Sequence, residues 1–373
     1  MSVNSAAHEN DGTTHDDAIE ERLASLAKPP GSLGLLEDWA AVLCRVQGTL
    51  SPQVDPASVL VFCADHGVKK ADDKISPFPS SVTQAVFRTL AAGKSGTAVL
   101  TRSSGAHLTV VDCGIDGNVS SVVACSNGEG CETSIDVVHA KVATGTADIR
   151  TSPAMTEAEL DAALSVGRER VAAEVRLRGT RCVAIGEVGI GNTTSASALL
   201  ASLTGVSAAE CCGRGTGLDE AGLAHKIATV QTACTFHGAV VGGGATTDPV
   251  LSREALRRVG GLELAAMVGA FHEAHEQRVV AIVDGFISAV AALAAVQIKP
   301  ACRASMIFAT AMAEEPLAGR GGEVLRKALN AKPALQMDLR LGEASGAALA
   351  LPLVRSAAAM ITQMATLQEA LAL

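Results

Sequence analysis

The sequence predicts an α/β protein with a doubly wound, mainly parallel sheet flanked by helices. Two observations lead to this fold class. Short apolar, β-branched runs alternate with longer Ala/Leu-rich segments through the middle of the chain, as they do in βαβ units. Several of these runs are continuously apolar, which is typical of parallel strands covered on both faces. Sheets of this kind bind their ligands at the carboxyl ends of the strands.

The expected elements follow one another in chain order. We expect strands at 57–63, 107–113, 182–187, 279–285 and 304–310, and helices at 83–102, 157–177, 193–204, 218–233 and 285–297. The stretch 114–135 is rich in Gly and Ser, and it predicts an irregular loop.

The two ends of the chain differ from the middle. Residues 1–20 are polar and acidic, with no apolar run and no Arg, so they predict a flexible tail and neither a secretory signal nor a transit peptide. Residues 21–50 predict a helix interrupted at 28–31, and residues 345–373 predict continuous helix. We expect 21–50 and 325–373 to form a small helical subdomain beside an α/β nucleotide- and base-binding domain of residues 51–324.

Composition limits the kinds of partner. A net charge of −9 argues against nucleic acid or an anionic membrane as a partner, and an aromatic content of 2% argues against stacked bases. The longest apolar stretch near the C-terminus contains Pro352 and Arg355, so it predicts a buried helix and not a membrane span. Ten cysteines without a C-x-x-C pair predict free thiols in a cytoplasmic protein.

The most informative segment is GEVGIGNTTSASALLASLTG at 186–205, which follows an expected strand and opens an expected helix. Its glycines allow tight turns, and backbone amides at such a helix start bind phosphate. The expected phosphate-binding residues are Gly189, Ile190, Gly191, Asn192 and Thr193. The third glycine of a dinucleotide fingerprint and the Gly-Lys-Ser/Thr of a P-loop are both missing. Glu187 ends the strand, where it either faces the ligand crevice or closes the strand into solvent.

A second glycine-rich turn at 211–226 adds Arg214, Gly215 and Thr216, followed by an expected helix. Lys226 falls about two turns into that helix and is expected to reach a phosphate. Arg214 alone is more often a surface charge. Two glycine-rich helix starts in one domain fit a ligand that carries a phosphate and a ribose.

Two further segments predict walls of the site. Glu343 lies in a glycine-flanked loop before an apolar helix, where apolar surroundings raise the pKa of a carboxyl group toward the range useful for a general base. The alternative is a helix N-terminal Glu favoured by the macrodipole. Ser76 and Phe78 belong to a stiff Pro-containing turn that is expected to form a wall of an aromatic-base pocket.

His272 and His275 have no nearby third ligand, so no metal site is expected.

Together these segments resemble one family, the nicotinate-nucleotide–dimethylbenzimidazole phosphoribosyltransferases of the cobalamin lower-ligand pathway. The matching stretches occur in family order from residue 28 to about residue 360 and are KPPGSLGLLE (28–37), ADHGV (64–68), SPFPSSVTQ (76–84), GTADIRTSPAMT (145–156), GEVGIGNTTSASALL (186–200), GRGTGL (213–218), GGLELAAMVGAF (260–271), VDGFISAVAAL (283–293) and LRLGEASGAALALPL (339–353).

The resemblance implies roles for particular residues. Glu343 matches the catalytic base, and Glu187 matches a second acidic residue at the ribose and base. Phosphate-holding positions match Gly189, Gly215 and Lys226, and the wall of the benzimidazole pocket matches Ser76 and Gln84. The family also implies a homodimer and a transfer that needs no cofactor, from nicotinate mononucleotide to 5,6-dimethylbenzimidazole or a related base.

Some positions depart from the family pattern. Ala311 and Ala318 stand where histidine is common, and Ser81 stands where an acidic residue is frequent. These changes leave open a catalytically impaired nucleotide-binding pseudoenzyme. An α/β oxidoreductase using the G-x-G turn is disfavoured because the third glycine is missing. The natural acceptor (dimethylbenzimidazole, another benzimidazole, adenine or a phenol) stays open, as does a role in synthesis or in remodelling.

Overall fold

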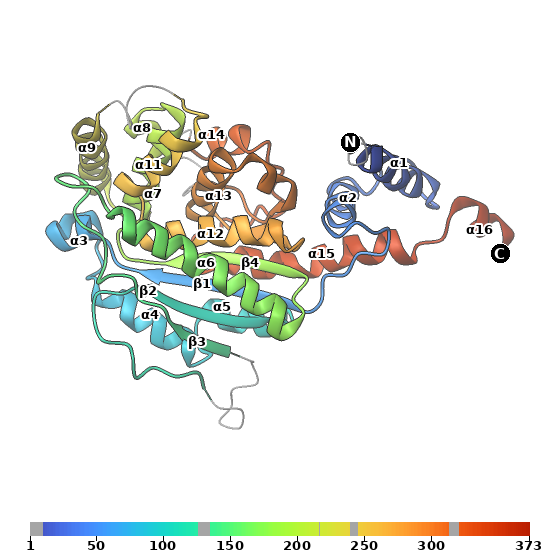
Figure 1. The fold of residues 1–373 in the computed structure, drawn as a ribbon, viewed down its shortest axis with the longest axis horizontal. Helices are drawn as coiled ribbons and strands as arrows, with labels where there is room; N and C mark the ends of the chain where they lie inside the picture. The colour runs from blue at the N-terminus through green and yellow to red at the C-terminus, as the bar shows by residue number, and fades with distance from the viewer. Residues whose placement is uncertain (1–9, 126–134, 216, 239–244, 313–320) are drawn as a thin grey trace, which may run out of the picture.

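The structure, a computed structural model, describes residues 10–125, 135–215, 217–238, 245–312 and 321–373. Its centre is a six-stranded, all-parallel sheet with the order β3-β2-β1-β4-β5-β6. The strands are β1 (Ala57–Ala64), β2 (His107–Gly114), β3 (Ile135–His139), β4 (Cys182–Val188), β5 (Val280–Val283) and β6 (Met306–Phe308). The expected α/β class with a doubly wound parallel sheet is confirmed (Figure 1).

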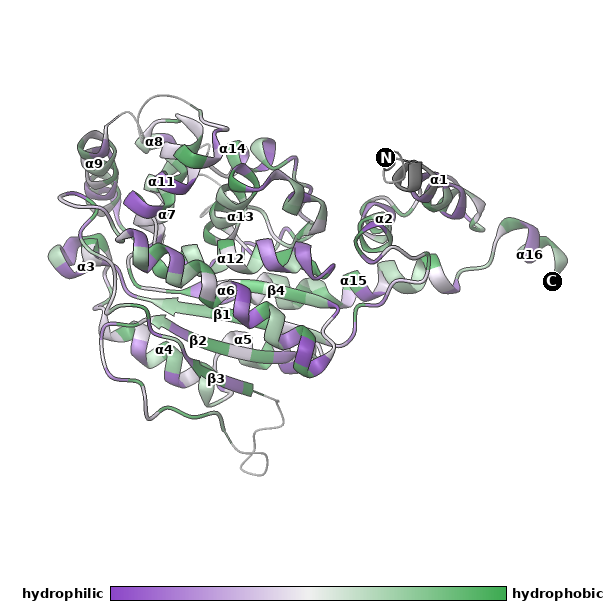
Figure 2. Cartoon of the chain, viewed as in Figure 1, coloured by the Kyte–Doolittle hydropathy of each residue, from purple (hydrophilic) through white to green (hydrophobic). Residues whose placement is uncertain are grey.

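Strand β1 lies at the centre, with β2 on one side and β4 on the other. The strand order reverses between β1 and β4, and such a switch point opens a ligand crevice at the carboxyl ends of the strands. Every residue of β1 is buried, because alternate side chains enter two different cores. Leu60 and Phe62 enter one core, and Val59 and Val61 enter the other. Figure 2 shows the apolar character of these central strands.

Helices cover both faces of the sheet. One face carries α6 (Glu157–Arg178), α7 (Asn192–Thr204), α8 (Ala208–Cys211), α9 (Glu220–His237), α11 (Pro249–Val259), α12 (Leu262–Glu276), α13 (Phe286–Ile298) and α14 (Gly321–Ala328). The other face carries α2 (Leu35–Gln47), α4 (Ser81–Ala91), α5 (Gly96–Ser103) and α15 (Ser345–Gln363). Short α3 (Gly67–Ala71), η1 (Asp73–Ile75) and η2 (Pro300–Ser305) connect these elements.

Close contact between α6 and α12 accounts for part of the small-residue composition. A Cβ placed on Gly167 would lie 1.8 Å from the Ala266 carbonyl oxygen, and one on Gly269 would lie 2.0 Å from the Leu164 carbonyl oxygen. The two helices therefore pack backbone against backbone. Any larger residue at either glycine would force them apart.

Several expected elements have different limits. The stretch expected as a loop up to 135 ends where edge strand β3 begins, and β3 pairs with β2 from Leu108 and Ile135 onward. It is short and half-exposed, so it lacks the continuous apolar run that marks the central strands. The helix expected at 83–102 is divided into α4 and α5 at Gly93, which has a φ of 69°. Ser95 then caps α5 by accepting from the Ala98 N–H.

The chain termini also differ from expectation. Residues 10–20 belong to helix α1 (Asn10–Ser25) instead of a tail, and Ile19 is fully buried. The Arg22 guanidinium donates to the Ile361 and Met364 carbonyls. Residues 345–373 form two helices, because Thr366 caps a separate α16 (Leu367–Ala372).

Figure 1 shows α1, α2, the end of α15 and α16 lying beside the sheet domain. Leu26 pairs with Thr366 across this region. The expected boundary at 325 falls inside α14, which packs against α7, α8 and α13. A helical subdomain formed from both ends of the chain stays a prediction.

Helix α15 is long and apolar enough to cross a membrane by length and composition. Its apolar face is buried against α2, α5 and β4, so within this fold it is a core helix. Eight cysteines of the described residues are free and buried. Cys125 is disulfide-bonded, so the expectation of free thiols is wrong at this position.

Candidate active site

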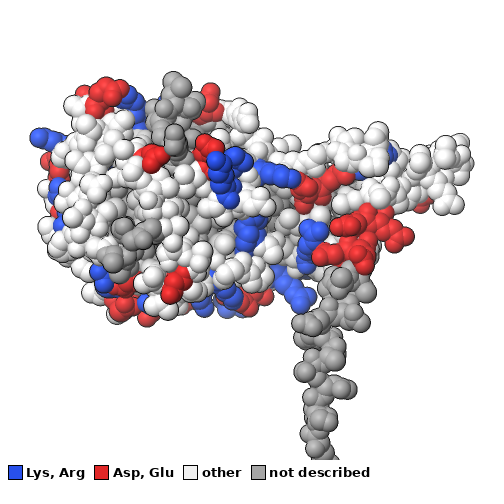
Figure 3. Space-filling model, turned by 90° about the horizontal axis from the view of Figure 1, so that it is seen from above, with Lys and Arg blue, Asp and Glu red and all other residues white. Residues whose placement is uncertain are grey.

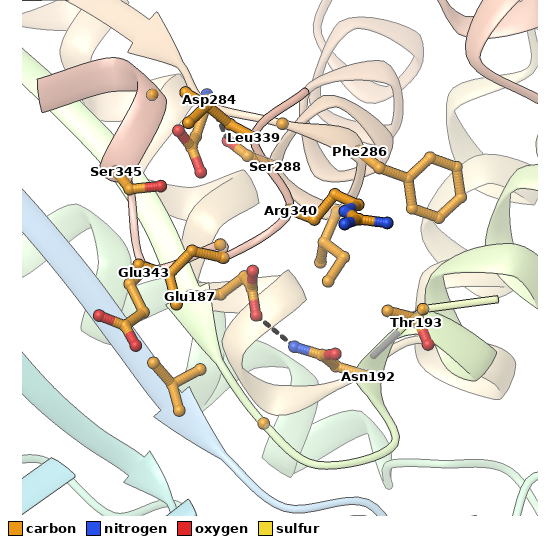
Figure 4. A pocket seen from close by; sticks show the side chains of 18 of the residues that line it. Glu187, Asn192, Thr193, Asp284, Phe286, Ser288, Leu339, Arg340, Glu343 and Ser345 are labelled. Carbon is orange, nitrogen blue, oxygen red and sulfur yellow. Dashed lines mark hydrogen bonds between the residues drawn. The ribbon is translucent and has the colours of Figure 1, made fainter. Parts of the chain in front are cut away.

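A cavity of about 340 Å³ opens at the carboxyl ends of β4, β5 and β6. It is lined by Phe78, Val82, Val86, Glu187, Val188, Gly189, Ile190, Asn192, Thr193, Gly215, Asp284, Gly285, Phe286, Ile287, Ser288, Thr310, Ala311, Leu339, Arg340, Leu341, Gly342, Glu343, Ser345 and Gly346. Figure 4 shows its polar side chains converging from several elements. The position is the one that the doubly wound sheet predicts for a ligand.

Three carboxyl groups meet at this cavity: Glu187 at the end of β4, Asp284 directly after β5, and Glu343 before α15. Burial raises the pKa of Glu187 well above its usual value, and the charges of Glu263, Asp284 and Glu343 raise it further. The Asn192 amide opposes this rise by donating a hydrogen bond to Glu187 Oε2. A cation entering the cavity would favour the ionised forms of these groups.

The pKa values of the other two carboxyl groups are raised as well. Burial raises the pKa of Asp284 from 3.8 to about 7, against the lowering effect of backbone amides at the start of α15. Burial also raises the pKa of Glu343, and the neighbouring Thr97 and Ser95 partly offset this effect. The site therefore holds carboxyl groups that take up protons at a higher pH than exposed ones.

Asp284 gives a pH dependence of stability whose sign follows from this shift. A carboxyl group that binds its proton more tightly in the folded state stabilises the fold at low pH, and this contribution falls as pH rises through the window between the two pKa values. We expect the melting temperature of the ligand-free wild type, relative to Asp284→Asn, to fall between about pH 4 and pH 8. Differential scanning fluorimetry measures it, with exposed Asp338→Asn as the control. A constant or rising difference would contradict the shift.

The Glu343 carboxylate is presented by an unusual backbone. Gly342, Glu343 and Ala344 have φ values of 76°, 59° and 65°, and each left-handed non-glycine residue costs about 1–3 kcal/mol. The turn is pinned at Glu343, whose N–H donates to the Glu187 carbonyl at 3.1 Å. A Cβ on Gly186 would lie 2.2 Å from the Ala344 nitrogen, so only glycine at 186 lets the turn approach β4. Glu343 Oε2 has no hydrogen-bond partner among the described residues, as suits a proton acceptor.

The first glycine-rich turn lines the cavity, but not all of its backbone amides are free to bind a ligand. Gly191 is the N-terminal cap of α7 with a φ of 99°, and it lies away from the cavity, next to Lys69. The Ile190 N–H donates to Thr83 Oγ1 at 3.1 Å, and Thr83 Oγ1 donates to Asp65 Oδ1 at 2.6 Å. The amide of Ile190 is therefore engaged by α4, although the residue itself lines the cavity.

The second turn contributes Gly215 to the cavity wall. Lys226 lies behind the wall and is fully buried. Its Nζ donates to Thr193 Oγ1 and to the Gly213 carbonyl, each at 3.0 Å, so it joins the two glycine-rich turns. Arg214 pairs with Glu220 outside the cavity lining. Thr216 lies outside the described residues.

The cavity has an apolar wall that contains Phe78, Val82, Val86 and Leu341. Ser76 and Gln84 do not line it. The Ser76 hydroxyl accepts from the Phe78 N–H, and Gln84 Nε2 donates to the Asp116 carbonyl. Both side chains brace the segment that carries the wall.

Sequence reasoning missed several lining residues, above all Asp284 and Arg340. Asp284 follows β5 as Glu187 follows β4, and this repeated position of an acidic residue at a strand end was the available signal. Arg340 is exposed at the rim, and it forms neither an ion pair nor a hydrogen bond with any described part of the chain. Figure 4 shows its guanidinium on the same side of the cavity as Thr193.

The fold and the site define the class of protein: an α/β protein whose cavity at the carboxyl edge of the sheet joins two glycine-rich turns to a cluster of carboxyl groups. A family model described as phosphoribosyltransferase matches residues 9–371. The chain belongs to this phosphoribosyltransferase family.

Relatives with known names agree with this assignment. The chain is 42% identical over 355 residues to the nicotinate-nucleotide–dimethylbenzimidazole phosphoribosyltransferase of Pseudomonas putida, covering 95% of this chain and 93% of the relative. It is 40% identical to the protein of the same name from Bradyrhizobium diazoefficiens, covering 95% and 93%. The crystal structure of CobT from Thermus thermophilus superposes with a TM-score of 0.82 at 32% identity, covering 96% and 98%.

Proposed function

We propose that this protein transfers the 5-phosphoribosyl group of nicotinate mononucleotide to 5,6-dimethylbenzimidazole or a related base, which yields α-ribazole 5'-phosphate and nicotinate. The observation that carries the proposal is Glu343. Glu343 Oε2 is buried and lacks a hydrogen-bond partner among the described residues. Glu343 lines the same cavity as the apolar wall, and burial raises its pKa. The names of the relatives supply the donor and acceptor.

The chemistry matches these residue types. The donor carries a cationic pyridinium on its anomeric carbon, and nicotinate leaves as a neutral ring, so the leaving group needs no acid. The attacking base must lose a ring proton, which Glu343 accepts as general base. Glu187 stabilises the positive charge that develops on the ribose. Attack on the face opposite nicotinate converts the β-linked donor into an α-linked product. No pyrophosphate leaves, so the transfer itself does not require Mg²⁺.

The substrates fit the two halves of the cavity. The donor phosphate lies at Gly189, Thr193 and Gly215, with Lys226 holding these turns together. The acceptor lies against the apolar wall, with its ring N–H directed to Glu343. Phosphate is thus held mainly by backbone amides, and in the view of Figure 3 Lys and Arg are interspersed with Asp and Glu instead of forming a basic face. We further propose, on the family resemblance, a cytoplasmic homodimer with no nucleic-acid or membrane partner.

The pseudoenzyme alternative rests on Ala311, which lines the cavity without a polar group; Ala318 lies outside the described residues. Retention of Glu187, Glu343 and Lys226 favours turnover. Incubation of the purified protein with nicotinate mononucleotide and a panel of dimethylbenzimidazole, benzimidazole, adenine and phenol decides between the two. Product with any base supports the transferase and identifies the acceptor. Saturable nucleotide binding without any product supports the pseudoenzyme.

We expect Arg340→Met to raise the KM for nicotinate mononucleotide about tenfold or more, with little change in kcat. The guanidinium of Arg340 lies at the rim and has no ion-pair partner among the described residues. A hydrogen bond from it to the donor phosphate would contribute about 1.5–3 kcal/mol. Steady-state kinetics at saturating acceptor measures this change. Arg176→Met, an exposed position on α6, is the matched control. An unchanged KM would place the donor phosphate elsewhere.

A further inference from the structure

The helix that follows Glu343 begins without a cap of its own. Its N-cap residue is Ala344, which is left-handed at a φ of 65° and has no side chain able to accept a hydrogen bond. Helix starts normally rely on a side-chain oxygen that accepts from the third helical N–H. In α15 that third residue is Ala347, whose side chain is fully buried, so solvent does not supply the acceptor.

Asp284, from another part of the chain, supplies the acceptor for the Ala347 N–H. The Ala347 N–H donates to Asp284 Oδ1 at 2.8 Å, and Asp284 is only 6% exposed. The first turn of α15 is shaped for this contact, because a Cβ on Gly346 would lie 3.0 Å from Asp284 Oδ1 and 2.2 Å from Thr310 Cγ2. The backbone amides of Gly346 and Ala344 also act on the pKa of this carboxyl group.

The backbone of Asp284 is itself fixed to the sheet. Its carbonyl accepts from the Thr310 hydroxyl at 2.9 Å. Its N–H donates to Ser288 Oγ, which in turn donates to the Ile185 carbonyl of β4. The carboxylate is thus a rigid point on the strands against which α15 is placed.

Glu343 lies directly before this capped turn, inside the left-handed run 342–344. Such a run relaxes toward ordinary backbone angles unless its surroundings hold it. Two anchors hold it here: the Glu187 carbonyl accepts from the Glu343 N–H, and Asp284 accepts from the helix that follows. We propose that Asp284 is a positioning residue, which caps α15 from the end of β5 and thereby holds Glu343 where it reaches the acceptor base.

This inference rests on the proposed transfer for its kinetic readout, and it also predicts a stability effect that does not depend on the reaction. Asp284→Ala leaves the Ala347 N–H unpaired, so we expect kcat to fall roughly a hundredfold, the loss typical of a small misplacement of a catalytic group. The dissociation constant of nicotinate mononucleotide should change less than about threefold. Asp284→Asn keeps an acceptor oxygen of the same shape and should restore kcat to within about fivefold of wild type.

A second-site variant separates positioning from direct contact with substrate. Glycine adopts left-handed angles without strain, so Ala344→Gly should lessen the need for the cap. We expect Asp284→Ala/Ala344→Gly to recover at least about tenfold in kcat over Asp284→Ala. Asp284→Ala should lower the melting temperature by about 2 °C or more, and the double variant should recover most of this loss. Ala344 does not line the cavity.

The experiment is this cycle of four proteins plus Asp284→Asn, measured by steady-state kinetics, isothermal titration calorimetry with nicotinate mononucleotide, and thermal melting. A folded Asp284→Asn as inactive as Asp284→Ala, or additive effects of Asp284→Ala and Ala344→Gly, would overturn the proposal. If Asp284→Ala does not fold, Asp284→Asn decides alone, since a loss above about a hundredfold in that folded variant is incompatible with capping. A wild type without transferase activity refutes the proposed function, and the melting-temperature cycle then still tests the cap.

Discussion

Replacing Glu343 with Gln is expected to lower kcat at least about a hundredfold while the dissociation constant of nicotinate mononucleotide stays within a few fold. Gln has the shape of Glu and accepts hydrogen bonds, but it does not accept the ring proton of the attacking base, and general bases typically contribute about 10²–10⁴-fold. Quenched time courses with saturating dimethylbenzimidazole give kcat, and calorimetry gives donor binding.

The pH profile adds an independent check on Glu343. A base works only when ionised, so activity falls as pH falls through its pKa, and burial raises that pKa above 4.5. The acid limb of kcat/KM for nicotinate mononucleotide, which reports groups of the ligand-free enzyme, should therefore lie above pH 4.5 and disappear in the residual activity of Glu343→Gln. Glu169→Gln, on the exposed face of α6, serves as the control. A Glu343→Gln variant within tenfold of wild type would remove Glu343 from the role of base.

Replacing Glu187 with Gln is expected to lower kcat by about 10²–10³-fold, the range seen when one group that stabilises transition-state charge is lost. Glu187 lines the cavity and is held by Asn192, so the variant keeps the shape and loses the charge. Single-turnover rates with saturating donor isolate this effect from binding. A variant with normal single-turnover rates would show that the ribose charge is stabilised elsewhere.

Proton release provides the second measurement on Glu187. Because burial raises the pKa of Glu187 well above its usual value, this carboxyl group holds its proton more tightly in the empty site than an exposed one does, and a bound pyridinium cation favours its ionisation. We expect nicotinate mononucleotide binding to release protons, measured by calorimetry in buffers of different ionisation enthalpy. Release should decrease in Glu187→Gln. Binding without any proton exchange in the wild type would contradict the raised pKa.

The local sequence pattern was sufficient to predict the central strands of the sheet. The runs at 57–63, 107–113 and 182–187 are mostly apolar, and they are buried throughout because both faces of each strand are covered. The expected strands there are confirmed. Edge strand β3 and helix α1 were not found. Strand β3 is short and half-exposed, and α1 has a largely polar sequence. Each is fixed by a distant partner: β2 for β3, and the end of α15 for α1.

The site shows the same division. The two glycine-rich turns and Glu343 could be selected from local sequence, since each lies at an expected helix start, although the helix macrodipole alone also favours a Glu at such a position. Asp284 does not stand out in the sequence, because its contact with Ala347 involves a helix that begins about 60 residues later. The engagement of Ile190 by Thr83, the burial of Lys226 behind the wall and the outward bonding of Gln84 are also tertiary facts. Roles in catalysis and binding stay predictions for all of these residues.

The most direct measurement is one time course that follows nicotinate, α-ribazole 5'-phosphate and free ribose 5-phosphate together, with and without dimethylbenzimidazole. The account predicts that nicotinate and ribazole phosphate appear in equal amounts, that the product is the α anomer by NMR, and that nicotinate release stops without acceptor. Acceptor-independent release of ribose phosphate, or a β-linked product, would contradict single displacement with Glu343 as the base.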